Sequence, residues 1–470
     1  MSGSCAYICI FLKTRITYMH NFLHVFIITK DMTVGSPFKT IIYFSIPMLI
    51  GGIFQQFYGV ADTIIIGKFV GSRALASIGA TTSTMFFFLS FAIGFTNAFS
   101  IVMGQFFGAK NESMLKTTFL SSIYLTLFSS FILFVLGIFL SRPLMILLQT
   151  PADIIDNSVL YLQICVGLSF GQLIYNGASS ILRALGDSKT PLYFLILTTV
   201  LNIILDLVFV ALLKMNVFGV AIATVISQII SAFLSVLYII KKFPILKLHR
   251  EDIVFNFDNL FMIIKIGVSM SVQAIFLSIG EMIISGVVNT FGTNVVASYT
   301  TGNRINQFAS MAYFVVSEAF AVYVAQNFGA QKFDRIKEGF RSIIILSLSL
   351  SLFATLVIFI FGDNLIRLFI SSNDEYIEII VEICRGYLRI SSMFYPFLAI
   401  ILLYNNSIRA IGKALIPLIS GIVELVIKVG GSVFLSIPFG YVGVWFANPV
   451  GWALGILPSC IYFHKYAFKK

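Results

Sequence analysis

Apolar runs of about 20 residues recur along almost the whole chain, and they restrict its fold more than any other feature. An α-helix of that length crosses the hydrocarbon core of a bilayer. Of the 470 residues, 58% are hydrophobic and only 11% are charged, whereas about 25% are charged in soluble globular proteins. Since backbone amides and carbonyls must be paired inside a membrane, the runs predict an all-α polytopic membrane protein.

The apolar runs predict twelve membrane-spanning helices in two groups of six. The first six are expected near residues 41–66, 74–104, 117–140, 158–181, 191–213 and 217–240. The second six are expected near 260–288, 295–325, 340–361, 386–407, 412–435 and 440–463. We therefore predict an N-terminal extension over 1–31, a six-helix bundle over 32–243, a polar linker over 244–259 and a second bundle over 260–470.

The N-terminal extension contains neither a full span nor a cleavage site after an apolar core, so it is not expected to be a signal peptide. We expect it to be dispensable. Most of the 31 basic residues fall in the loops on one side of the predicted membrane and in the two termini. Both termini are therefore predicted to be cytoplasmic, in a multi-pass protein of the plasma membrane. The same distribution accounts for the net charge of +11, and no nucleic-acid partner is expected.

The two predicted halves repeat each other. The segment QFFGA at 105–109 returns as QNFGA at 326–330, and RALG at 183–186 returns as RAIG at 409–412. Because each half has an even number of helices, both copies start on the same side of the membrane. Parallel repeats of this kind are typical of secondary transporters, with binding sites within or between the repeats.

Several segments together resemble the multidrug and toxic compound extrusion (MATE) family. They are FSIPMLIGGIFQQFYGVADTIIIGKFVG, the two Q-x-x-G-A segments, ILRALGDSKTP, and LNIILDLVF followed by GVAIAT. The resemblance extends from Thr33 to the C-terminus and is closer to the DinF-like and MepA-like branches than to the NorM branch. It implies a V-shaped pair of six-helix bundles, working as a monomer. Such a protein exports organic cations or other amphiphilic molecules by alternating access, driven by an inward H⁺ or Na⁺ gradient.

Two carboxylates in the first half are expected to lie inside the membrane. Asn202 and Asp206 are four residues apart and share a helix face, and Asp62 and Thr224 are expected at a similar depth. Carboxylate, amide and hydroxyl oxygens are ligands that small hard cations prefer, and two nearby carboxylates also suit proton capture. The alternative is a set of polar contacts between helices, and for Asn202 or Thr224 alone we favour that alternative.

The MATE resemblance matches the same positions. It implies that Asp62, Asn202, Asp206 and Thr224 form the site of the coupling ion, H⁺ or Na⁺. Tyr161 and Asn176 are weaker candidates for the substrate-binding wall, and for Tyr161 a place in an interfacial aromatic belt is the commoner explanation. We expect no cofactor besides the coupling ion.

Glu281 is the main acidic candidate in the second half. It aligns with Gly59, one turn from Asp62, and has no cationic residue three or four positions away. Either it is a neutral residue of the wall, or it faces the chamber and attracts cationic substrates or a second ion. We favour the second reading. In the NorM branch a glutamate of the seventh helix contributes to a cation site. Glu424 and Lys428, four residues apart, are expected to form a buried ion pair.

The chain has no G-x-S-x-G, H-E-x-x-H or P-loop motif, and its four histidines lie outside the predicted spans. An enzyme is therefore not expected, and an ion gradient is the expected energy source. The alternative function is a lipid-linked oligosaccharide flippase of the same superfamily, because Arg304 and Lys428 place positive charge within spans. The small-molecule substrate and the lipid bilayer are the expected partners.

Overall fold

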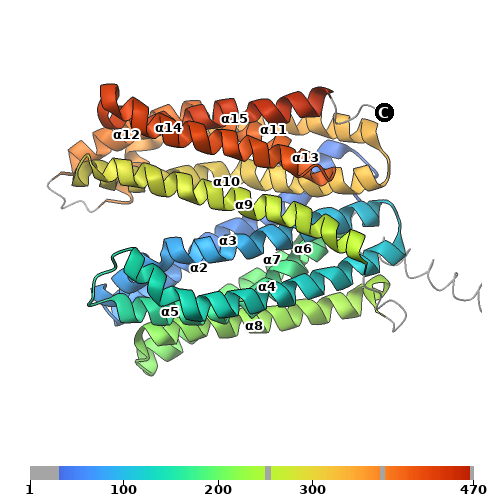
Figure 1. Ribbon diagram of the computed structural model, residues 1–470, viewed down its shortest axis with the longest axis horizontal. Coiled ribbons are helices and arrows are strands. Elements are labelled where there is room, and N and C mark those ends of the chain that lie inside the picture. The colour runs from blue at the N-terminus through green and yellow to red at the C-terminus, as the bar shows by residue number, and fades with distance from the viewer. Residues whose placement is uncertain (1–30, 249–255, 371–375, 466–470) are drawn as a thin grey trace, which may run out of the picture. The chain divides into compact units, whose positions relative to one another are not determined.

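The computed structural model describes residues 31–248, 256–370 and 376–465, and all regular elements in these ranges are helices (Figure 1). The first half contains α2 (Pro37–Phe69), α3 (Ser72–Gly108), α4 (Glu112–Leu147), α5 (Ile155–Gly167), α6 (Phe170–Ala184), α7 (Lys189–Asp206), the π-helix η1 (Leu207–Leu212), α8 (Asn216–Lys242) and the short η2 (Pro244–Leu246). The second half contains α9 (Phe257–Asn289), α10 (Thr293–Gly329), α11 (Phe333–Arg367), α12 (Ile377–Met393), α13 (Tyr395–Ala410), α14 (Leu415–Trp445) and α15 (Ala447–Lys465).

The helices confirm the prediction of an all-α polytopic membrane protein. Among the described residues, nine helices are long and apolar enough to cross a membrane, and the count is eleven if each of two bent pairs forms one span. The twelve predicted segments correspond in order to the observed helices. The fourth and tenth are the bent pairs α5–α6 and α12–α13, and α15 is the twelfth. At 19 residues, with Asn448 and His464 among them, α15 falls outside the nine.

The boundary between the last two helices differs from the prediction. A helix was predicted over 412–435, but α14 continues to Trp445 across a kink near Pro438 and Gly440. Gly440 has a φ of 57°, which changes the direction of the chain without a loop. The last helix therefore starts at Ala447 rather than at residue 440.

The backbone repeats as the sequence does. α2 and α9 each contain 33 residues, and α3 and α10 each contain 37. The bend between α5 and α6 is 42° and that between α12 and α13 is 47°, and the two bends lie at matching positions of the repeat. Gly186 and Gly412, in the repeated RALG and RAIG segments, both have positive φ angles, of 86° and 82°. The internal duplication predicted from the sequence is thus present in the structure.

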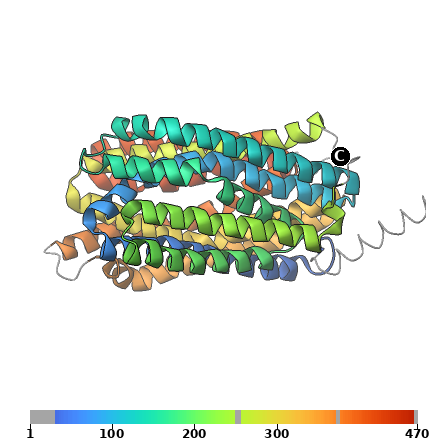
Figure 2. The same ribbon diagram turned by 90° about the horizontal axis from the view of Figure 1, so that it is seen from below.

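Two compact units make up the structure. The first contains Ile53–Ile264, and the second contains Gly35–Gly52, Lys265–Phe328 and Lys332 onward. Within each unit the long helices run roughly parallel or antiparallel to one another (Figures 1 and 2). The limits of the two predicted bundles stay a prediction. The predicted N-terminal extension lies outside the described residues apart from Asp31, as does part of the predicted linker.

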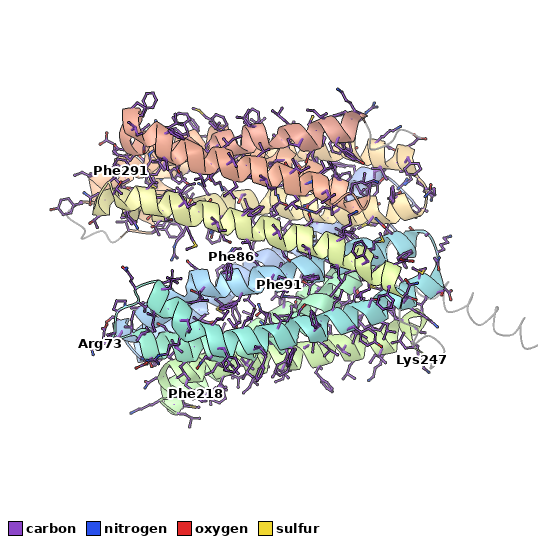
Figure 3. The ribbon with its side chains drawn as sticks, in the orientation of Figure 1. Arg73, Phe86, Phe91, Phe218, Lys247 and Phe291 are labelled. Atoms are coloured by element: carbon purple, nitrogen blue, oxygen red, sulfur yellow. The ribbon has the colours of Figure 1, made fainter. Side chains whose placement is uncertain are left out.

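Close packing in the first unit sets the position of α8. A Cβ atom built on Gly171 of α6 would lie 2.8 Å from the backbone nitrogen of Ile229 on α8, so only glycine allows the two helices this approach. Figure 3 shows Arg73, at the start of α3, and Lys247, after α8, at opposite ends of this unit. The helices of the unit therefore run from one of these ends to the other.

Candidate functional site: a buried polar cluster in the first unit

The pairing of α7 with α8 places four polar residues at matching levels. The hydroxyl groups of Thr198 on α7 and Ser231 on α8 are in contact, which fixes the register of these antiparallel neighbours. Moving one turn along each helix brings Asn202 level with Gln228. A second turn brings Asp206 level with Thr224. The side chains of both Asn202 and Asp206 are fully buried.

α2 and α5 complete the site. The carboxyl group of Asp62 on α2 lies next to that of Asp206. One turn earlier on α2, the phenol of Tyr58 lies next to the hydroxyl of Thr224. On α5, Tyr161 lies close to Tyr58 and Asp62. Four helices of the first unit thus meet here, and three of them, α2, α7 and α8, carry the group of side chains that we call the polar cluster: Tyr58, Asp62, Asn202, Asp206, Thr224 and Gln228.

Many atoms of the polar cluster are buried without a hydrogen bond. Within the described residues this holds for Tyr58 Oη, Asp62 Oδ1, Thr224 Oγ1, Gln228 Oε1 and both side-chain polar atoms of Asn202 and of Asp206. An unpaired buried polar group typically costs about 1–3 kcal/mol, so folded proteins contain few of them. So many in one place indicate a site that a cation, a proton or water completes.

Apolar side chains surround the polar cluster. Ile65 and Ile66 of α2, Val210 of η1 and Val220 and Val225 of α8 belong to one buried hydrophobic group around it. In such surroundings electrostatic interactions are stronger than in water. The two carboxylates have two amide side chains and two hydroxyls beside them and no basic side chain in the polar cluster. They can therefore bind a monovalent cation or hold a proton between them.

A π-helix starts directly after Asp206. η1 spans Leu207–Leu212, and the amide of Leu213 donates to the carbonyl of Val208, five residues earlier, at 2.9 Å. Short π-helical segments occur frequently at functional sites. This one is a second local feature that sets the region around Asp206 apart from an ordinary span.

The structure brings together the four residues predicted for the coupling ion, Asp62, Asn202, Asp206 and Thr224, and their role stays a prediction. Tyr161 is buried, with 6% of its surface exposed, and packs beside the polar cluster, and its role stays a prediction. Asn176 lies on α6, beyond the bend after α5, and in the described protein it forms no hydrogen bond with the polar cluster.

Sequence reasoning missed Tyr58 and Gln228. Both could have been found from helical spacing, because Tyr58 is four residues before Asp62 and Gln228 four residues after Thr224. Cys165 is buried one turn after Tyr161 and near both carboxylates. The patterns were present, but isolated tyrosines and glutamines in spans are common enough to pass unnoticed.

Glu281 of the second unit has a partner that its neighbours in the sequence do not reveal. Lys428 Nζ on α14 lies 3.1 Å from Glu281 Oε1, and the hydroxyl of Tyr299 donates to Glu281 Oε2 at 2.9 Å. The predicted pair between Lys428 and Glu424 is also present, at 3.9 Å, but it is the longer of the two contacts. No residue three or four positions from Glu281 could have indicated this partner, because Lys428 is 147 residues away in the chain. The role of Glu281 stays a prediction.

These features define a class of protein. A helical membrane protein with duplicated halves, broken spans at matching positions and buried carboxylates inside one half has the architecture of a secondary transporter. The MatE family profile matches residues 47–208 and 269–442, which is more than half of the chain. The protein therefore belongs to the MATE family of multi-pass membrane transporters and is not an enzyme.

Comparisons with individual proteins agree with this assignment. Probable multidrug resistance protein YpnP of Bacillus subtilis is 30% identical over 84% of this chain and 87% of its own. Multidrug export protein MepA of Staphylococcus saprophyticus is 25% identical over 87% of this chain and 90% of its own. The structure of a MOP superfamily transporter from Pyrococcus furiosus has the same fold, with a TM-score of 0.85 at 21% identity, covering 92% of this chain and 97% of that one.

Proposed function

We propose that this protein exports organic cations or other amphiphilic small molecules across the plasma membrane, driven by entry of H⁺ or Na⁺. The observation that carries the proposal is the polar cluster, in which two carboxylates lie side by side among buried atoms without hydrogen bonds. The names of the relatives YpnP and MepA, a probable multidrug resistance protein and a multidrug export protein, support the choice of substrate class.

The proposed cycle starts with an ion that enters from outside and binds between Asp62 and Asp206. Its positive charge reduces the negative charge of the pair, and the helices that carry the pair then repack. The substrate loses its binding surface and leaves. Each monovalent cation that moves down 100 mV supplies about 2.3 kcal/mol, to which the chemical gradient adds. Cytoplasmic termini, a V-shaped pair of bundles and a monomeric working unit belong to the same proposal.

The flippase alternative has less support. It depended on Arg304 and Lys428 as positive charges within spans, and Lys428 is paired with both Glu281 and Glu424. Arg304 on α10 is exposed, and no acidic side chain of the described residues forms an ion pair with it. Of the two residues, only Arg304 still favours a substrate with a negatively charged head group.

Transport by purified protein in liposomes tests the proposal. We expect a fluorescent organic cation to leave the compartment only when an inward H⁺ or Na⁺ gradient is present. Each gradient is imposed alone, with the membrane potential clamped, and liposomes without protein give the background. Export that is equally fast without either gradient would overturn the coupling. Movement of a lipid-linked oligosaccharide, without export of any organic cation, would favour the flippase instead.

Thr224→Val should weaken ion binding without preventing it. Valine keeps the shape of the side chain and removes one hydroxyl ligand of the ion. We take the loss to be similar to that of one hydrogen bond, about 1 kcal/mol. We expect the ion concentration for half-maximal export to rise about fivefold. The matched control is Thr199→Val on α7, whose hydroxyl donates to the backbone carbonyl of Leu195 at 2.8 Å. An unchanged ion dependence in Thr224→Val would remove Thr224 from the proposed site.

A further inference from the structure

Lys428 is a buried ammonium group placed between two carboxylates. The side chains of Lys428 and Glu424 are 3% and 6% exposed, whereas that of Glu281 is 43% exposed. Lys428 Nζ lies 3.1 Å from Glu281 Oε1 and 3.9 Å from Glu424 Oε1. Gly280 leaves room for the lysine side chain, because a Cβ atom there would lie 2.9 Å from Lys428 Cδ.

The groups around this ammonium are held in place from several helices. Tyr299 of α10 donates to Glu281 Oε2 at 2.9 Å, and its ring stacks on Trp445 with centroids 5.7 Å apart and planes inclined by 4°. Asn448 of α15 adds an amide side chain next to Glu281. Two carboxylates, a phenol and an amide therefore surround one positive charge, which is nearly the set of groups found in the polar cluster of the first unit.

The two units differ in what supplies the positive charge. The polar cluster of the first unit contains no basic side chain, and most of its side-chain oxygen atoms are buried without a hydrogen bond to any described residue. In the second unit the chain itself provides the cation, Lys428, and its partner Glu281 lies one turn from the position that the repeat pairs with Asp62. An ammonium group and a sodium ion carry the same charge, and both bind carboxylate oxygens. While the ammonium is in place, a second cation would meet its repulsion at close range.

We propose that the second unit contains a monovalent-cation site that the chain's own Lys428 fills permanently, so that this unit takes up no coupling ion. Glu281, Glu424, Tyr299 and Asn448 are the ligands of this site. Removing the ammonium without removing its bulk opens the site to Na⁺. That ion coupling depends on the first unit alone follows only if the proposed function is correct. That Lys428 occupies the site does not depend on the proposed function.

Sodium binding to the purified full-length protein in lipid nanodiscs tests the proposal. The background variant Asp62→Asn/Asp206→Asn removes both carboxylates of the first unit. With Lys428 intact, we expect no saturable binding of radioactive Na⁺ to this background. Adding Lys428→Met should create one saturable site per protein, and adding Glu281→Gln as well should remove it. Lys428→Arg, which keeps the charge, is the matched control and should bind no Na⁺.

Two results would overturn the proposal. One is saturable Na⁺ binding with Lys428 intact that disappears in Glu281→Gln. The other is a folded Lys428→Met variant that binds no Na⁺. If Lys428→Met does not fold in choline chloride, NaCl at equal ionic strength should restore the folded yield, and failure to do so counts against the site. A failure of the proposed function can be told apart from these results. In that case the wild-type protein would show no ion-driven export, regardless of whether the variants bind Na⁺.

Discussion

Asp62→Asn and Asp206→Asn are each expected to abolish ion-coupled export while the protein stays folded. Asparagine keeps the shape of aspartate and removes its charge, so the site loses one of its two carboxylates and can no longer hold a proton between them. The remaining carboxylate offers a cation fewer charged oxygen ligands, which weakens ion binding in the proposed cycle. Export of a fluorescent organic cation from proteoliposomes under imposed H⁺ and Na⁺ gradients measures the effect, and size-exclusion chromatography in detergent checks the fold.

Asp156→Asn is the matched control for these two variants. Asp156 lies on α5 of the same unit but is exposed, and it forms an ion pair of 3.1 Å with Arg142. Exposed pairs contribute only about 0–1 kcal/mol, so this variant should export at nearly the wild-type rate. If Asp62→Asn or Asp206→Asn behaved like this control under both gradients, the altered residue would not be the coupling group.

Gly171→Val is expected to cause a large loss of folded protein. The added side chain would meet the backbone of Ile229, since even a Cβ atom at Gly171 would lie 2.8 Å from its nitrogen and 3.0 Å from its Cα. Overpacking typically costs about 1–3 kcal/mol and more when backbone must move. The displaced helix would be α8, which carries Thr224 and Gln228. Thermal unfolding in detergent, followed by the loss of the monodisperse peak, measures the effect.

Gly79→Val separates this clash from the general effect of valine in a helix. Gly79 lies on α3 in the same unit, and a Cβ atom there would have no atom of the described protein within 4 Å. We expect its melting temperature to stay close to that of the wild type. Equal losses in the two variants would mean that the contact between α6 and α8 is not what makes Gly171 necessary.

The sequence was sufficient to predict most of the helices and the repeat. Apolar runs, glycines and prolines mark helix ends by local rules, and repeated segments such as QFFGA and QNFGA reveal the duplication directly. The bends after α5 and α12 escaped notice, although Gly167 ends α5 and Pro396 lies in the first turn of α13. Glycine and proline also occur within continuous membrane-spanning helices, so these residues alone did not predict the bends.

The site was predictable where its residues share one helix. Asn202 and Asp206 could be paired from their spacing, and a charge at Asp62 inside a span demanded a function. The contact between Glu281 and Lys428 could not be foreseen, since it joins α9 to α14. The sequence instead favoured Glu424, four residues from Lys428 on the same helix, and that contact is the longer one.

The equal lengths of α3 and α10 bear on the thickness of membrane that the protein can occupy. At 37 residues each, these helices are about 56 Å long. A bilayer with its head groups measures only about 40–45 Å. Even at the usual tilt of about 20° the helix ends extend past the lipid. A thicker or thinner bilayer would therefore cover more or less of these overhanging turns, and the polar cluster would stay at the same distance from the helix ends.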